Sequence, residues 1–107
     1  MLVVTMNDLP GFRIVKVLGT VRGVTVRARS VVGTAGAFLQ MLVGGNITVF
    51  SKLAEQTRQE AYELLVAHAR EMGANAVVAM RYDANEMAST ATEVMAYGTA
   101  VVVEEVQ

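Results

Sequence analysis

Beta-branched residues dominate the first quarter of the chain and predict two strands. Residues 12–29 are rich in valine and isoleucine, a composition that is typical of a long strand. Gly19 and Gly23 interrupt this stretch and predict bulges or bends. A shorter apolar run at residues 2–5 predicts a first strand, and Leu9-Pro10-Gly11 predicts a tight turn between the two.

Residues 76–83 and 92–104 predict two further strands near the C-terminus. We expect the polar segment 84–90 to form the turn of an antiparallel hairpin between them. Apolar residues occupy both faces of these strands, a pattern that is typical of strands buried on both sides. Helices on one face of such a sheet would leave the other face bare, so that something else must cover it.

Residues 47–72 predict a long helix, because apolar residues recur there at three- and four-residue steps. Gly73 is its expected C-terminal cap. A second, smaller apolar patch of Tyr62, Val66 and Ala69 lies away from the main stripe, and we expect it to face outward. The main stripe consists of Phe50, Leu53, Ala54, Thr57, Ala61, Leu64, Leu65, His68 and Met72.

Residues 30–43 predict an earlier helix that Ser30 caps and that is apolar nearly all round. A helix of this kind must be covered on most sides. The elements together predict a single α+β domain over residues 1–107, in two layers, with the order β-β-α-α-β-β and a mostly antiparallel sheet.

The composition excludes several classes of protein. Hydrophobic residues make up 53% and charged residues 18%, which is incompatible with a disordered chain. The formal net charge of -1 lacks the basic excess of a nucleic-acid-binding protein, and we expect no nucleic-acid partner. Because the chain has no cysteine and one histidine, it cannot form thiolate metal sites, disulfides or a cysteine nucleophile.

The N-terminal residues lack the basic region of a secretory signal, and Pro10 interrupts the apolar run early. The longest apolar stretch, residues 30–43, is shorter than the ~20 residues that a membrane-spanning helix needs. We therefore expect a soluble cytoplasmic protein that has no membrane partner.

Five segments, taken in order, resemble the YbjQ-like family. They are Leu9-Pro10-Gly11-Phe12-Arg13-Ile14, Gly19-Thr20-Val21-Arg22-Gly23, Gly44-Gly45, Gly73-Ala74-Asn75-Ala76-Val77-Val78 and Tyr97-Gly98-Thr99-Ala100-Val101. The resemblance implies a small bacterial or archaeal protein of unknown biochemical function, labelled "putative heavy-metal-binding". It also implies alpha-beta subunits that assemble into ring-like pentamers. Asn46 and Thr48-Val49-Phe50 depart from the family pattern, which is expected to carry an acidic residue, a charged stretch and a tyrosine there.

Metal ligands are scarce within one chain. Soft metals prefer thiolates and thioethers, borderline metals prefer imidazole, and hard cations prefer carboxylates. The seven methionines are scattered, and Met41, Met72, Met80 and Met95 lie at positions typical of a hydrophobic core. We therefore assign no metal ligand, no cofactor and no catalytic residue. A metal site on a ring axis, with one ligand from each subunit, stays open.

Two candidate sites each have a structural alternative. We expect His68 to be a neutral core residue with one hydrogen bond rather than a ligand, because burial disfavours an imidazolium. Asp83, Glu86 and Glu93 cluster around the last turn and could bind a hard cation. We favour a solvated turn with a cross-strand Arg81–Glu93 ion pair.

Glycines and arginines suggest anion sites only weakly. Residues 33–36 and 44–46 lack the spacing of a phosphate-binding loop, and helix ends explain their glycines. Arginines on the long strand could attract an anion in an oligomer, but a solvated strand face or inter-subunit ion pairs are favoured. These arginines are Arg13, Arg22, Arg27 and Arg29.

The abundance of apolar residues predicts self-association. A small domain buries only about 60 to 65% of its unfolded surface, and large exposed apolar patches mark interfaces. Several separate patches favour a heterologous contact, which closes into a ring or continues as a filament. We expect a non-enzymatic, ring-forming homo-oligomer, with five subunits implied by the resemblance, that acts as a binding or scaffolding surface. The alternative is a metal- or small-ligand-binding module with sites at subunit interfaces.

Overall fold

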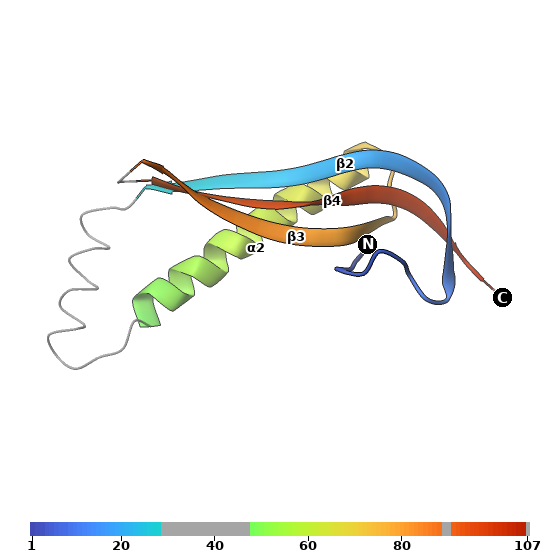
Figure 1. The fold of residues 1–107 in the computed structure, drawn as a ribbon, viewed down its shortest axis with the longest axis horizontal. Coiled ribbons are helices and arrows are strands. Elements are labelled where there is room, and N and C mark those ends of the chain that lie inside the picture. Colours follow the sequence, from blue (N-terminus) through green and yellow to red (C-terminus); the bar gives the residue numbers. More distant parts are fainter. Residues whose placement is uncertain (29–47, 89–90, 107) are drawn as a thin grey trace, which may run out of the picture.

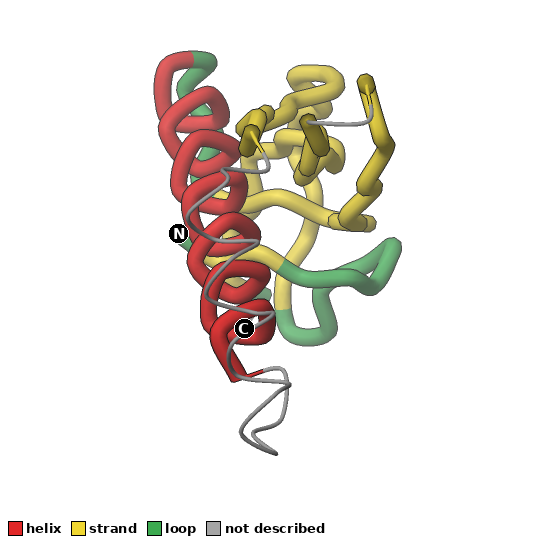
Figure 2. The backbone as a smooth tube through the Cα atoms, turned by 90° about the vertical axis from the view of Figure 1, so that its left-hand side faces the viewer, coloured by secondary structure: helices red, strands yellow, loops and turns green. Residues whose placement is uncertain are grey.

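The computed structural model describes residues 1–28, 48–88 and 91–106. Helix α2 lies across one face of a four-stranded sheet, so that the described part of the fold has two layers (Figures 1 and 2). This arrangement confirms the α+β class. The predicted helix at residues 30–43 lies outside the described residues. The described elements are β1 (Leu2–Val3), β2 (Phe12–Ala28), α2 (Thr48–Glu71), β3 (Ala76–Ala88) and β4 (Ala91–Glu105).

The sheet has the strand order β1-β3-β4-β2 and is mixed. β4 pairs antiparallel with β2 and with β3, whereas the short β1 pairs in parallel with β3. The expectation of a mostly antiparallel sheet is therefore corrected. The physical reason is the path of the chain after β1, which crosses the sheet face opposite α2 and enters β2 at the far edge.

The hairpin of β3 and β4 is longer than its sequence predicts. β3 continues to Ala88 and β4 begins at Ala91, so that most of the predicted turn 84–90 is strand. The ladder persists through the pairs Ala84–Val94 and Glu86–Thr92. Polar residues are compatible with a strand here because the side chains of residues 81–86 are exposed.

The boundaries of α2 confirm the helix prediction. The backbone N–H of Ala74 donates to the carbonyl of Ala69, and that of Gly73 donates to the carbonyl of Arg70, both at 3.0 Å. This pair of bonds is a Schellman cap, in which Gly73 adopts a φ of +88°. Gly73 is thus the C-terminal cap that the sequence predicts.

The buried side of α2 differs from the predicted stripe. Thr57, Ala61, Leu65 and Ala69 form the buried line, at strict four-residue steps, whereas Leu53 and Leu64 are exposed. The predicted outer patch is wrong, because Ala69 is fully buried and Tyr62 packs against the core cluster. Small side chains in this line let the helix backbone approach the sheet closely, which sets the helix's rotation.

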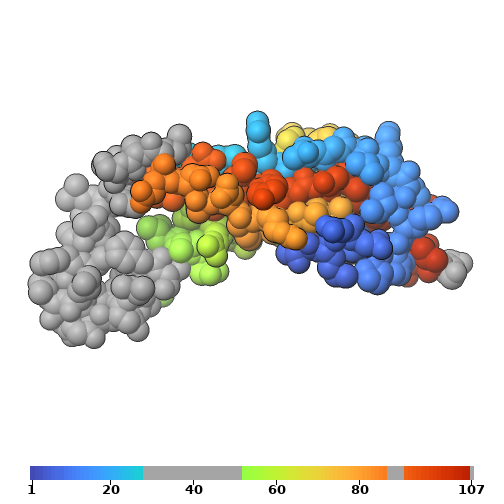
Figure 3. Space-filling model, in the orientation of Figure 1, coloured from blue at the N-terminus to red at the C-terminus, as the bar shows by residue number. Residues whose placement is uncertain are grey.

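The N-terminal segment covers part of the sheet face opposite α2. Leu9 packs there with Val78, Val101 and Val103, and all four side chains are buried. The predicted tight turn follows, since the N–H of Phe12 donates to the carbonyl of Leu9 at 2.9 Å. In Figure 3, dark-blue N-terminal atoms lie against the orange atoms of β3, and further atoms of β3 and β4 lie at the surface in the middle of the view.

A bulge in β3 holds the same segment in place. The register of β3 and β4 shifts between Val78 and Arg81, and Ala79 adopts a φ of 55°. This conformation lets the N–H of Ala79 donate to the carbonyl of Met6 at 2.7 Å, while that of Met80 donates to Val4 at 3.0 Å. In β2, Gly19 marks a bulge as predicted, but Gly23 does not, because the register there is continuous.

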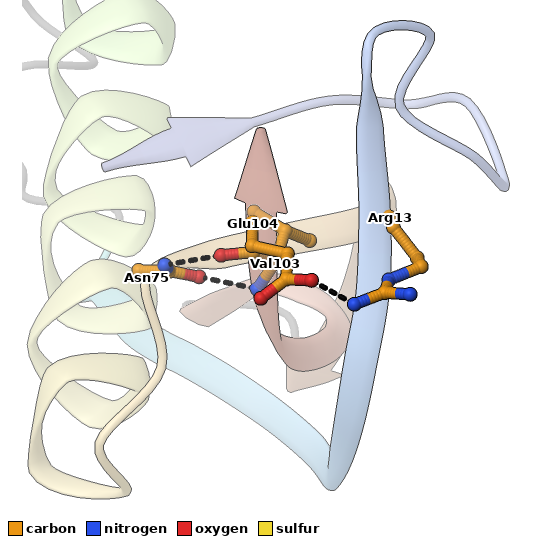
Figure 4. A network of polar contacts seen from close by, with 4 residues as sticks. All are labelled: Arg13, Asn75, Val103 and Glu104. Carbon is orange, nitrogen blue, oxygen red and sulfur yellow. Dashed lines mark hydrogen bonds and ion pairs between the residues drawn. The ribbon is translucent and has the colours of Figure 1, made fainter. Parts of the chain in front are cut away.

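Asn75 joins the end of α2 to the last strand (Figure 4). Its side-chain amide donates to the carbonyl of Val103 at 2.9 Å, and its side-chain oxygen accepts from the N–H of Val103 at 2.8 Å. The amide therefore replaces a strand partner that β4 would otherwise lack at this position. On the opposite side of β4, Arg13 forms an ion pair with Glu104.

Candidate functional site

His68 extends from α2 to the outer edge of β2. Its Nδ1 lies 3.2 Å from the backbone nitrogen of Arg22 and 3.3 Å from the carbonyl oxygen of the same residue. The Nδ1 atom accepts from the N–H of Arg22 when it carries no proton, and donates to the carbonyl oxygen of Arg22 when it carries one. His68 is half-buried, so its predicted core position is wrong. Its role at this position is to occupy the outward backbone groups of an edge strand.

The acidic residues of the hairpin do not form a single site. Asp83 lies opposite Met95, and Glu93 lies opposite Asn85 and Val26 in the ladder. Glu86 points to the other face of β3 from Asp83, because side chains alternate along a strand. Among the residues that the structure describes, no three His, Cys, Asp or Glu side chains could hold a metal ion together.

The predicted Arg81–Glu93 ion pair is wrong. Arg81 lies opposite Tyr97 in the ladder, because the strands continue through most of the predicted turn and bring Asn85 opposite Glu93. Its guanidinium donates instead to the carbonyl of Thr5 at 2.7 Å and to that of Met80 at 2.8 Å. Arg81 thus fastens the N-terminal segment to the sheet.

The arginines of β2 are dispersed and partly neutralised within the chain. Arg13 forms an ion pair with Glu104, and Arg27 forms one with Glu60 of α2. Arg22 is exposed on the edge strand, and Arg29 lies outside the described residues. The described arginines therefore do not converge on one anion site.

Two of the four methionines that the sequence assigns to the core lie there. Met80 is buried in the main cluster, and Met72 packs against that cluster. Met95 is half-buried on the sheet face opposite α2. Met41 lies outside the described part of the chain, as do the glycine-rich segments 33–36 and 44–46 and the departure from the family pattern at Asn46.

A tyrosine–arginine pair beside α2 has no signal in the sequence. The guanidinium carbon of Arg58 lies 5.8 Å from the centre of the Tyr82 ring, within range of a cation–π contact. Tyr82 is exposed, but the partial loss of water around its phenol raises its pKa, as do Tyr62 and Glu55, whereas Arg58 lowers it. Only the pairing of β3 beneath the first half of α2 brings these side chains together.

An exposed apolar surface follows β2. Val15, Val17, Val24 and Val26 are exposed, and Val17 retains 65% and Val26 retains 52% of its accessible surface. Tyr97 is exposed beside them, on β4. The sequence indicates excess apolar residues on this strand, but only the sheet order places the strand at an edge, where one side has no strand partner among the described residues.

The family model described as "Putative heavy-metal-binding", of the YbjQ type, matches residues 1–104 of the chain. The chain belongs to the YbjQ family. Two curated relatives, both called UPF0145 protein, extend the match. The relative from Solibacter usitatus is 58% identical over 99 residues, covering 92% of this chain and 88% of its own length. The relative from Burkholderia thailandensis is 57% identical over 100 residues, covering 94% of this chain and 90% of its own length.

A crystal structure of a protein of unknown function from Pediococcus pentosaceus, placed in the DUF74 family, has a similar fold. It matches with a TM-score of 0.65 over 97% of this chain and 98% of that chain, at 15% sequence identity. The likeness at this identity shows the fold alone. Neither YbjQ relative carries the name of an enzyme. No helix in the described residues has the length and apolarity that crossing a bilayer requires.

Proposed function

We propose that this YbjQ protein is a non-enzymatic subunit that associates with further copies of itself into a ring, and that the ring acts as a binding or scaffolding surface. The exposed valines of β2 carry this proposal. Exposed apolar side chains that gather along one element mark an interface more often than a solvated surface. A chain of 107 residues has little other means of covering them.

The geometry favours a heterologous contact over a twofold one. The apolar surface on β2 lies at one edge of the sheet, and the exposed Tyr82 lies on β3, on the other side of β4. Different patches that bind each other repeat head to tail, and such a contact ends only when it closes into a ring. The resemblance of the sequence to the family implies five subunits.

Native mass spectrometry and light scattering on untagged protein at micromolar concentration test the proposal. We expect one species whose mass is an integral multiple of 11.4 kDa, with five as the multiple. A well-folded monomer would refute self-association, and a dimer would refute the heterologous contact. The same spectra report any metal or small ligand that remains bound.

The description of the family favours a second function, a metal-binding module with sites at subunit interfaces. Among the described residues of one chain, no three His, Cys, Asp or Glu side chains could hold a metal ion together. Such a site therefore needs residues from more than one copy. Calorimetric titration with zinc distinguishes the cases. One ion per oligomer supports a site on the ring axis, and one ion per chain fits a site at each interface. Tight binding of one ion per chain to a monomeric variant would contradict our assignment of no site within the monomer.

A further inference from the structure

The outer edge of β2 has outward-pointing backbone groups beyond Arg22. His68 contacts the N–H and C=O of Arg22, which therefore point away from β4. The register with β4 is continuous from Gly19 to Ala28, and the direction of backbone groups alternates along a strand. Val24 and Val26 consequently direct their N–H and C=O groups outward. We call residues Val24–Ala28 the distal edge of β2.

The outer edge of β3 has the same property. Tyr97 of β4 lies opposite Arg22 on one side and Arg81 on the other. Because Arg22 points away from β4, Tyr97 bonds with β3, and Arg81 points toward β4. Tyr82 and Ala84 therefore direct their backbone groups outward. We call residues Tyr82–Glu86 the distal edge of β3.

The rest of each edge, residues 14–22 of β2 and residues 76–80 of β3, is protected from pairing. Two bulges interrupt β2 between Ile14 and Gly19, and His68 occupies the outward groups of Arg22. On β3, β1 pairs with Ala76 and Val77, and the N-terminal segment bonds to Ala79 and Met80. Proteins use bulges, charges and covering segments of this kind to keep edge strands from pairing. The described residues place no such segment against either distal edge.

The two distal edges are complementary in charge. The distal edge of β2 contains no acidic residue; its Arg27 pairs with Glu60 of α2, and the exposed Arg22 lies just before it. The stretch Tyr82–Ala88 contains Asp83 and Glu86 and no basic residue. The exposed Arg22 beside one edge and Asp83 on the other favour pairing between the two different edges over pairing of the β3 edge with itself.

The directions of the side chains also match. Val24 and Val26 lie on the sheet face opposite α2, because Val21 on the alternate positions packs in the core beneath the helix. Tyr82 and Ala84 lie on the helix face, since their partners Ala96 and Val94 belong to that core. In a parallel pair, an outward residue of one strand lies between two outward residues of the other. The helices of both copies then lie on the same side of a shared sheet.

We propose that the distal edge of β2 in one copy pairs as a parallel strand with the distal edge of β3 in the next copy, which joins their sheets. This inference deepens the proposed self-association and rests on it. β2 and β3 of one chain both run antiparallel to β4, so they run in the same direction, as a repeated rotation about a ring axis requires. Each copy uses both of its distal edges, and His68 sets where the shared pairing begins.

Proline variants test each edge separately. Val24→Pro and Ala84→Pro each remove one outward N–H and leave the ladder with β4 intact, the one place where a strand tolerates proline. We expect each variant alone to be a folded monomer by light scattering and circular dichroism. Val24→Thr and Ala84→Thr keep the N–H and are the matched controls, which should assemble like the wild type.

Mixing the two proline variants gives the sharpest result. The β2 edge of Ala84→Pro and the β3 edge of Val24→Pro are both intact, so the mixture should form dimers and nothing larger. Wild-type assembly by Val24→Pro would overturn the proposal. Normal assembly by Ala84→Pro with monomeric Val24→Pro would also overturn it, because β2 would then pair with itself. A monomeric wild type would instead refute the proposed function.

Cysteine cross-linking keeps the proposal testable if a proline variant does not fold. The chain has no cysteine of its own. Val24→Cys or Val26→Cys, mixed with Asn85→Cys, should give a disulfide-linked heterodimer on oxidation, because these side chains share one face. Ala84→Cys, on the other face, is the control that should not cross-link with them. Homodimers of Val26→Cys, or no cross-link in either mixture, would overturn the proposal.

Discussion

Gly23 of β2 lies directly beneath the backbone of α2, against the carbonyl of Ala61. A Cβ atom built on Gly23 would lie inside contact distance of the Ala61 oxygen and the Leu65 nitrogen, and 2.8 Å from the Cβ of Leu64. Real Cβ atoms essentially never approach heavy atoms within 3.0 Å. The glycine in the centre of the long strand therefore sets the distance between the helix and the sheet.

Gly23→Ala should destabilise the protein strongly. Its new methyl group meets helix backbone, which cannot rotate away, and overpacking of this kind costs about 1–3 kcal/mol or more. Gly11→Ala is the comparison, since it has open space around it and only a φ of +87° to accommodate. We expect it to cost about 1 kcal/mol. Urea unfolding measures both values, and equal losses would contradict the close approach.

Leu65→Ala and Leu64→Ala should separate the buried side of α2 from the exposed one. Leu65 is fully buried, whereas Leu64 retains 49% of its accessible surface. Truncation in the core costs about 2–5 kcal/mol, and a surface truncation stays within about 0.5 kcal/mol. Thermal unfolding of the two variants measures the difference. A larger drop in Tm for Leu64→Ala than for Leu65→Ala would contradict the observed rotation of the helix.

Asn75→Ala should lower the free energy of unfolding by about 1–3 kcal/mol, because the backbone N–H and C=O of Val103 lose both partners. Asn75→Asp retains the acceptor for the N–H of Val103 but sets a carboxylate oxygen against its carbonyl oxygen, so it should not restore the lost stability. Asn85→Ala is the control, since Asn85 is exposed and its side-chain amide donates to the side chain of Asp83 at the surface. Chemical denaturation of the three variants ranks their free energies of unfolding. Equal stability of Asn75→Ala and wild type would show that the two hydrogen bonds between Asn75 and Val103 do not stabilise the fold.

Tyr82 should make the fold sensitive to alkaline pH. Partial desolvation, with Tyr62 and Glu55, raises the pKa of this exposed side chain in the folded state, so the unfolded chain releases the phenolic proton first. Its contribution is fully present below about pH 10 and is lost as the pH rises through the folded-state pKa. Tyr82→Phe should flatten this loss in a pH series of thermal unfolding.

Arg58→Ala provides the complementary test for Tyr82. Arg58 lowers the pKa of Tyr82, so its removal should move the phenolate absorbance transition to higher pH. An unchanged transition would contradict the cation–π contact.

His68→Ala should expose the backbone of Arg22 at the edge of β2 and lower the free energy of unfolding only slightly. Arg22 loses a contact at a position that water can reach, which costs no more than about 1 kcal/mol. Amide hydrogen exchange should become faster at Arg22 and stay unchanged at Val21, whose backbone bonds with β4. Exchange that remains slow at Arg22 would show that His68 does not protect this edge.

Local patterns in the sequence determined the helix of residues 48–71, its cap at Gly73, the turn at Leu9-Pro10-Gly11 and the long strand β2. These features depend on neighbours within a few residues, because turn geometry, capping and side-chain periodicity are local properties. The ordered segments of the family were sufficient to assign it. They contain no ligand cluster, and for that reason the function stays a proposal.

Only the tertiary structure decided which apolar residues are buried. Leu64 and Leu65 are equally apolar in sequence, and the approach of Gly23 to the helix backbone makes one exposed and the other buried. The position of the hairpin turn likewise separates Arg81 from Glu93, because the strands pair as far as Ala88 and Ala91 and so bring Asn85 opposite Glu93. Strand order is a long-range property that no local pattern encodes, and it leaves the valines of β2 exposed at the edge of the sheet.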